Sequence, residues 1–286
     1  MFSETLELLS FDFVRQALLA SALLGLLSGV MTPLIVLRRM SFSVHATSEL
    51  ALMGGAAALL LGVNIGLGAV VGAIVAAVVL AVLGFRGQQD SSIGVVMSFG
   101  LGLAVLFLYL YPGNSSTAMS LLTGQIVGVS GASTWALTAV TAVVVGVVAL
   151  LWRPLLFASA DPEMASAAGI PVRAMSVIFA VLIGLASAQS VQIVGALLVM
   201  ALLITPGAAA AQIASSPLRA VAWSVLFAEV AAVGGLLLSL APGLPVSVFV
   251  TSISFAIYLI CRVIGGRRRV YRDEVTAARY SDSAHH

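Results

Sequence analysis

The chain has 286 residues, of which 61% are hydrophobic and only 8% are charged, and its mean hydropathy is +1.16. Soluble domains carry about 25% charged residues, so this composition excludes a soluble protein and predicts an all-α, multi-pass membrane protein. The net charge of +2 is too small to indicate nucleic-acid binding.

Two residue types narrow the function classes further. Every one of the 13 basic residues is an arginine, and the sequence has one cysteine, Cys261. Without a lysine the chain cannot form the phosphate-binding loop of a Walker-type ATPase. A single cysteine excludes a disulfide framework within the chain.

Apolar runs of about the 20 residues that a bilayer requires follow one another along most of the chain. The predicted spans are 14–37, 42–62, 65–85, 92–111, 133–152, 173–189, 192–213, 220–240 and 246–264. We therefore expect a bundle of about eight or nine transmembrane helices. The segment 115–130 is rich in glycine and serine, so an external loop, an interfacial helix and a re-entrant segment all remain open for it.

The arginines predict the orientation. If the amino terminus is outside, the arginines near the span ends fall on the cytoplasmic side and only Arg15 disagrees; they are Arg38, Arg39, Arg86, Arg153, Arg173, Arg219, Arg262 and 267–269. This distribution follows the positive-inside tendency and predicts a cytoplasmic carboxyl terminus. We expect residues 1–266 to form the transmembrane domain and 267–286 a polar, disordered cytoplasmic tail, in which His285 and His286 have the pattern of an appended tag.

Two ionisable residues lie on one face of the second span. His45 and Glu49 are four residues apart, and the helical rise places them about 9 Å and about 15 Å beyond Arg39. A neutral imidazole and a carboxylate suit Zn²⁺, Mn²⁺ or Fe²⁺. A structural hydrogen bond between the two side chains, or a protonated Glu49, is the alternative. Met53 follows on the same stripe, where methionine is more often a core residue than a ligand.

Two further features lie inside the predicted spans. Glu229 is near the middle of 220–240, and an acid at that depth is a functional candidate because its burial is costly. It could line a pathway, pair across helices or be protonated. Pro206 and Gly207 interrupt the run 192–213, which could expose backbone carbonyls to a cavity or only kink the helix.

The cytoplasmic segment 157–172 is too long for a simple connection. Asp161 can cap a short helix that has Pro162 at its first position and Glu163 in its first turn, and Gly169 can end it. Such a helix could dock a partner protein or merely join two spans.

Four sequence motifs resemble one family of transport proteins. They are Leu37-Arg38-Arg39-Met40, the loop from Asp161 through Ala168 to Ile170, the run from Val194 to Pro206, and Leu237 to Ser239 with Pro242 to Pro245. In this order they resemble the permeases of the manganese, zinc and iron class of ABC transporters, over nearly all of 14–264. One departure is clear: the family usually has an aspartate and then a histidine four residues on, whereas this chain has His45 first and Glu49 second.

The resemblance implies a permease subunit of the plasma or inner membrane, without enzymatic activity of its own. Its cargo would be Mn²⁺, Zn²⁺ or Fe²⁺, bound transiently by His45 and Glu49, with Glu229 and Met53 along the pathway and no permanently bound cofactor. Its partners would be an extracytoplasmic metal-binding protein, cytoplasmic ATPase subunits and a second permease in a dimer. Asp161, Glu163, Ala168 and Gly169 would belong to the helix that couples the permease to the ATPase.

Other readings of the sequence make different predictions. A secondary cation transporter or channel would need no ATPase and would use Glu229 or Glu49 as a relay. A membrane enzyme is disfavoured, because the spans contain no second histidine and no HExxH motif.

Overall fold

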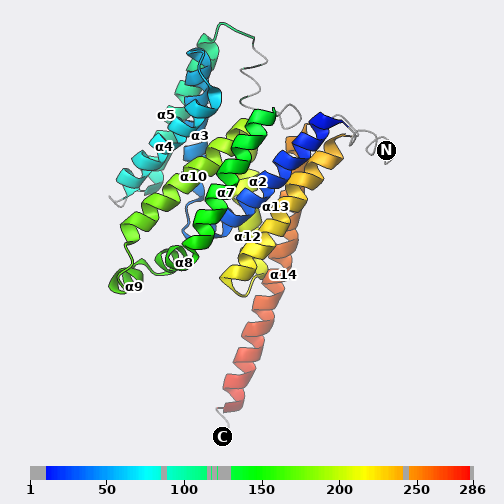
Figure 1. Ribbon diagram of the computed structural model, residues 1–286. Helices are drawn as coiled ribbons and strands as arrows, with labels where there is room; N and C mark the ends of the chain where they lie inside the picture. Colours follow the sequence, from blue (N-terminus) through cyan, green and yellow to red (C-terminus); the bar gives the residue numbers. More distant parts are fainter. Residues whose placement is uncertain are drawn as a thin grey trace.

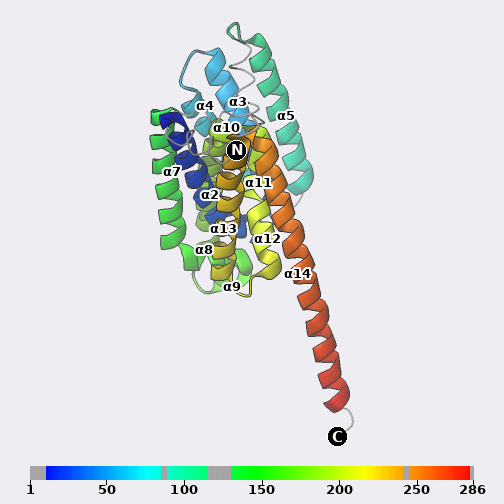
Figure 2. The same ribbon diagram turned by 90° about the vertical axis from the view of Figure 1, so that its right-hand side faces the viewer.

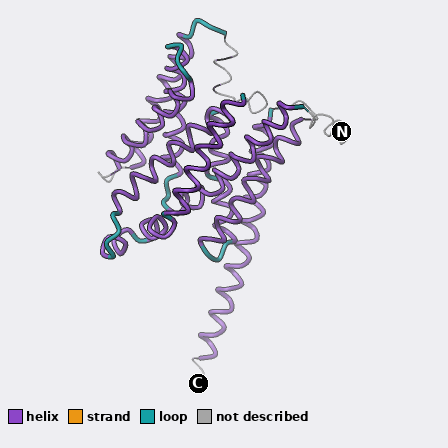
Figure 3. The backbone as a smooth tube through the Cα atoms, in the orientation of Figure 1, coloured by secondary structure: helices purple, strands orange, loops and turns teal. Residues whose placement is uncertain are grey.

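The computed structural model describes residues 11–84, 89–114, 117, 121, 130–240 and 245–283. Within these residues the chain is built from helices and loops (Figures 1 and 3). Six of the described helices are long and apolar enough to cross a membrane by length and composition. The predicted all-α membrane fold is therefore confirmed.

Most of the long helices begin and end within about three residues of the predicted spans, but the helix predicted over 173–189 extends to Val194 and the one predicted over 246–264 extends to Ser283. The described helices are α2 (Asp12–Leu37), α3 (Ser41–Leu60), α4 (Ile65–Gly84), α5 (Gln89–Leu110), α7 (Gly131–Leu150), α8 (Trp152–Ala160), α9 (Pro162–Ala167), α10 (Val172–Val194), α11 (Ala196–Leu203), α12 (Thr205–Ile213), α13 (Pro217–Leu240) and α14 (Val246–Ser283). The number of membrane crossings and the orientation of the termini stay predictions. Most of the segment 115–130 lies outside the described residues.

Two groups of helices make up the bundle. Helix α3 packs against α4 and α5, and α2 packs against α13, which in turn contacts α12 and α14. Helix α10 contacts α4 and α3 in the first group and α2 in the second, and so joins the groups (Figures 1 and 2). Large apolar side chains such as Phe99, Trp135 and Phe255 are exposed on the outer helices, as expected where a helix faces lipid rather than water.

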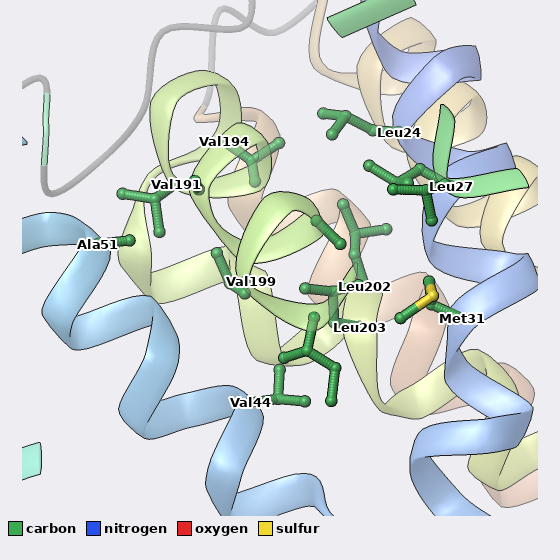
Figure 4. Packing of buried hydrophobic residues seen from close by; sticks show 14 of the residues in the cluster. Leu24, Leu27, Met31, Val44, Ala51, Val191, Val194, Val199, Leu202 and Leu203 are labelled. Atoms are coloured by element: carbon green, nitrogen blue, oxygen red, sulfur yellow. The ribbon is translucent and has the colours of Figure 1, made fainter. Parts of the chain in front are cut away.

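The predicted interruption of the seventh span is a real break in the helix. Gly195, with a φ of 77°, separates α10 from α11, and Ile204 separates α11 from α12. Pro206 falls in the first turn of α12, where its missing N–H costs no intrahelical bond. The eight-residue α11 is surrounded by the bundle: its Val199, Leu202 and Leu203 pack between side chains of α2 and α3 (Figure 4).

Helix α14 runs beyond the bundle toward the carboxyl terminus (Figure 2). Its backbone is helical to Ser283, whereas we expected a disordered tail after residue 266. The segment contains alanine, arginine and glutamate, residues with high helix propensity, which favours continuation of the helix over a coil. The division of the chain at residue 266 stays a prediction.

Candidate functional site

Helix α3 brings His45 and Glu49 together. The Nδ1 atom of His45 lies 3.9 Å from Oε1 of Glu49, too far for a hydrogen bond but within the range of an ion pair. The His45 side chain is 29% exposed and that of Glu49 is 10% exposed. The pair is thus inside the bundle, with the imidazole nearer to its surface.

Both side chains have a buried polar atom without a hydrogen-bond partner. Nδ1 of His45 and Oε2 of Glu49 are buried and make no hydrogen bond. Burying such atoms unpaired costs free energy, so the site is one that a ligand would stabilise. The alternative of a structural hydrogen bond between His45 and Glu49 is not what the geometry shows.

The neighbouring hydroxyl groups of α3 donate hydrogen bonds to backbone carbonyls of the same helix. Thr47 Oγ1 donates to the carbonyl of Ser43 at 2.7 Å, and Ser48 Oγ donates to the carbonyl of His45 at 2.7 Å. Met53 is half-buried and packs against the hydrophobic core. Among the described residues no third His, Cys, Asp or Glu completes a metal-binding group with the pair. Any further ligands would be of another kind, such as water or backbone oxygen.

Glu229 lies elsewhere, between α13 and α2. A Cβ atom placed on Gly25 would lie 2.9 Å from Cδ of Glu229 and 3.0 Å from each of its carboxylate oxygens. The carboxylate therefore rests directly on the backbone of α2, in space that glycine leaves open. The structure does not bring Glu229 into a metal-binding group with His45 and Glu49, so a role in the pathway stays a prediction.

The short helix predicted in the segment 157–172 forms at the expected residues. The side chain of Asp161 accepts a hydrogen bond of 2.9 Å from the backbone N–H of Met164, and Pro162 occupies the first turn. At the other end Gly169 adopts a φ of 82° and Ile170 N–H bonds to the carbonyl of Ala165, a Schellman-type ending.

One face of this helix is exposed. Ala165 is buried and holds α9 to the bundle, whereas Asp161, Glu163, Ala168 and Gly169 are exposed. Met164, a large apolar residue of the same helix, is 60% exposed. Helix α9 is thus anchored to the bundle through Ala165 and has a small exposed surface.

Arg38 makes specific contacts in the structure. The sequence indicates for it only a place in the orientation pattern and in a family motif. Its Nε donates to Ser159 Oγ at 2.6 Å, and its guanidinium lies 4.4 Å from the centre of the Phe179 ring. Burial lowers the pKa of Arg38 to about 10, so the group remains charged at neutral pH. Its partners are more than a hundred positions away in the sequence, where no local pattern indicates them.

Comparisons with known proteins agree with this architecture. The model of the ABC 3 transport family matches residues 10–265. The manganese transport system membrane protein MntC of Halalkalibacterium halodurans is 30% identical over 235 residues, covering 82% of this chain and 80% of the relative. The high-affinity zinc uptake system membrane protein ZnuB of Haemophilus influenzae is 28% identical, covering 80% and 88% of the two chains.

A solved structure has the same fold. PsaBC from Streptococcus pneumoniae, in complex with Fab, superposes with a TM-score of 0.84 at 28% sequence identity, covering 91% of this chain and 95% of the matched chain. The similarity extends over the whole bundle rather than over a single motif.

Proposed function

Because the chain belongs to the ABC 3 transport family, we propose that it carries a divalent transition metal ion through a site formed by His45 and Glu49. The chain is a multi-pass permease subunit of an ABC importer in the cell membrane, and ATP is hydrolysed by a separate partner. The metal and the residues that bind it are the proposed part.

One observation supports the choice of site: two buried polar atoms on one face of α3, Nδ1 of His45 and Oε2 of Glu49, have no hydrogen-bond partner. A nitrogen and an oxygen donor together favour Mn²⁺, Zn²⁺ or Fe²⁺ over Ca²⁺, which prefers oxygen alone. The relatives named for manganese and zinc transport support the same class of cargo. With only two protein donors the site would hold its ion weakly enough to release it.

The partners follow from the same reasoning. An extracytoplasmic binding protein would deliver the metal, a second permease subunit would complete the membrane pathway, and the cytoplasmic ATPase would dock on α9. Support for the last contact comes from the exposed Glu163 and Met164 on a helix whose two ends are fixed by Asp161 and Gly169.

Metal uptake by the complex in proteoliposomes tests the site. We expect His45→Ala and Glu49→Gln each to lower uptake of radioactive Mn²⁺ or Zn²⁺ by at least about tenfold, equivalent to about 1.4 kcal/mol. Thr47→Val is the matched control, because Thr47 bonds to its own helix and its position is about 200° around that helix from His45. Normal uptake by both site variants at normal expression would remove the site assignment.

The same assay separates the proposal from its main alternative. An ABC importer transports metal only with its ATPase and ATP, whereas a secondary transporter or channel would transport without them. Uptake by the permease alone, undiminished by loss of the ATPase, would contradict the proposal.

A further inference from the structure

We propose that Arg38 is a positioning residue that transmits movement of α9 to α3, and thereby to His45 and Glu49. The inference rests on the proposed roles of α9 and of the His45–Glu49 pair. It assigns the energy coupling within this chain to a specific side chain.

Arg38 joins three helices, α2, α8 and α10. It follows the last residue of α2, bonds to Ser159 and to the carbonyl of Leu155 on α8, and covers the ring of Phe179 on α10. The Leu155 carbonyl is 3.5 Å from Nη2, and Ser159 Oγ also donates to that carbonyl. The guanidinium is therefore part of a small network rather than a single contact.

Helix α8 leads directly into α9. Only Asp161 separates Ala160, the last residue of α8, from Pro162, the first residue of α9, and Asp161 N–H bonds back to the carbonyl of Phe157 on α8. A displacement of α9 must therefore move the carboxyl-terminal end of α8, where Ser159 holds Arg38.

On its other side Arg38 is tied to α3 by a very short turn. Arg39 has a φ of 56°, and Met40 N–H bonds to the carbonyl of Ile35 while Arg39 N–H bonds to that of Val36. These are the bonds of a Schellman-type helix end. Since α3 begins at Ser41, little chain is left to absorb a movement before the helix that carries the pair.

Arginine is suited to this role in a way that lysine is not. Its planar group can donate several hydrogen bonds in fixed directions while its face stacks on an aromatic ring. No carboxylate among the described residues forms an ion pair with Arg38. Its charge therefore does not serve to neutralise an acidic side chain. Arg39, one residue on, is exposed and carries the same charge without these contacts, which makes it the natural control.

The test measures metal transported per ATP hydrolysed by the permease–ATPase complex in proteoliposomes. We expect Arg38→Met to lower this ratio about tenfold, within the usual range of coupling between two sites, while assembly with the ATPase is retained. Arg38→Lys should restore only part of the ratio, and Arg39→Gln should leave it unchanged. A purely structural role would reduce the yield of complex without changing the ratio.

Several outcomes would overturn the inference. An unchanged ratio in Arg38→Met would show that Arg38 takes no part in coupling, and an equal loss in Arg39→Gln would show that only the positive charge of this turn matters. If Arg38→Met does not assemble, Ser159→Ala and Phe179→Leu replace it and must lower the ratio in the same direction; unchanged ratios in both would contradict the proposal. If the wild-type complex shows no ATP-dependent metal uptake, the proposed function fails together with the inference.

Discussion

At the scale of single residues, Gly25 and Gly29 lie one turn apart on α2 but face different parts of α13. A Cβ atom on Gly29 would lie 2.4 Å from Cα of Val225, whereas one on Gly25 would meet the flexible end of Glu229. Because backbone cannot move aside without separating the helices, Gly29→Ala should destabilise the protein by about 1–3 kcal/mol, measured as thermal stability in detergent. Gly25→Ala should cost less, because the Glu229 carboxylate can move.

A glycine with free space around it provides the control for this comparison. Gly94 on α5 has no atom within 4 Å of a built Cβ, so Gly94→Ala should leave the stability unchanged or raise it slightly. Equal stability of Gly29→Ala and Gly94→Ala would contradict the close approach of α2 and α13. The helix that these glycines of α2 contact was not predictable from the sequence, since Val225 and Glu229 are about 200 positions away.

At the scale of elements, two kinds of variant test α9: one changes its exposed surface and the other weakens the helix itself. Glu163→Arg reverses an exposed charge and should weaken docking of the ATPase, whereas Asp161→Ala removes the cap of the helix and should cost about 1 kcal/mol. We expect both variants to reduce copurification of the ATPase and metal-stimulated ATP hydrolysis.

Asp12→Arg is the control, because it is the same kind of charge reversal at the other end of the bundle, and it should change neither quantity. Normal copurification of the ATPase with Glu163→Arg would refute docking on this surface.

Elements were more predictable than their contacts. The apolar lengths predicted the positions of α2 to α5, α7, α10 and α13, and the Asp-Pro-Glu and Gly signals predicted α9, because these features are local. Helix α8 was missed: its nine residues, with Arg153 and Pro154 near the start, show neither the length of a span nor a capping signal. The spacing of His45 and Glu49 placed them on one face, but their separation and their unpaired atoms depend on packing by other helices.

At the scale of the whole molecule, the predicted orientation follows from the arginines and can be tested with single cysteines. With Cys261 replaced by alanine, Val63→Cys, in the exposed turn between α3 and α4, should react with a membrane-impermeant maleimide in intact cells. Ser166→Cys on α9 should react only after the membrane is opened. The reverse pattern would place the amino terminus in the cytoplasm and would separate α9 from the compartment that holds ATP.

The division between α11 and α12 has a consequence for biogenesis. By hydropathy alone the stretch Leu198–Ile213 is a continuous apolar segment, and the insertion machinery of the cell selects segments by such apolar character. The eight residues of α11 reach only about 12 Å, far less than the hydrocarbon thickness. We therefore expect the segment to enter the bilayer as one helix and to separate at Ile204 only when Gly207 closes against Thr32 of α2, where a Cβ would lie 2.5 Å from a backbone carbon. The broken helix would then be a product of assembly, formed after synthesis of the membrane domain rather than during it.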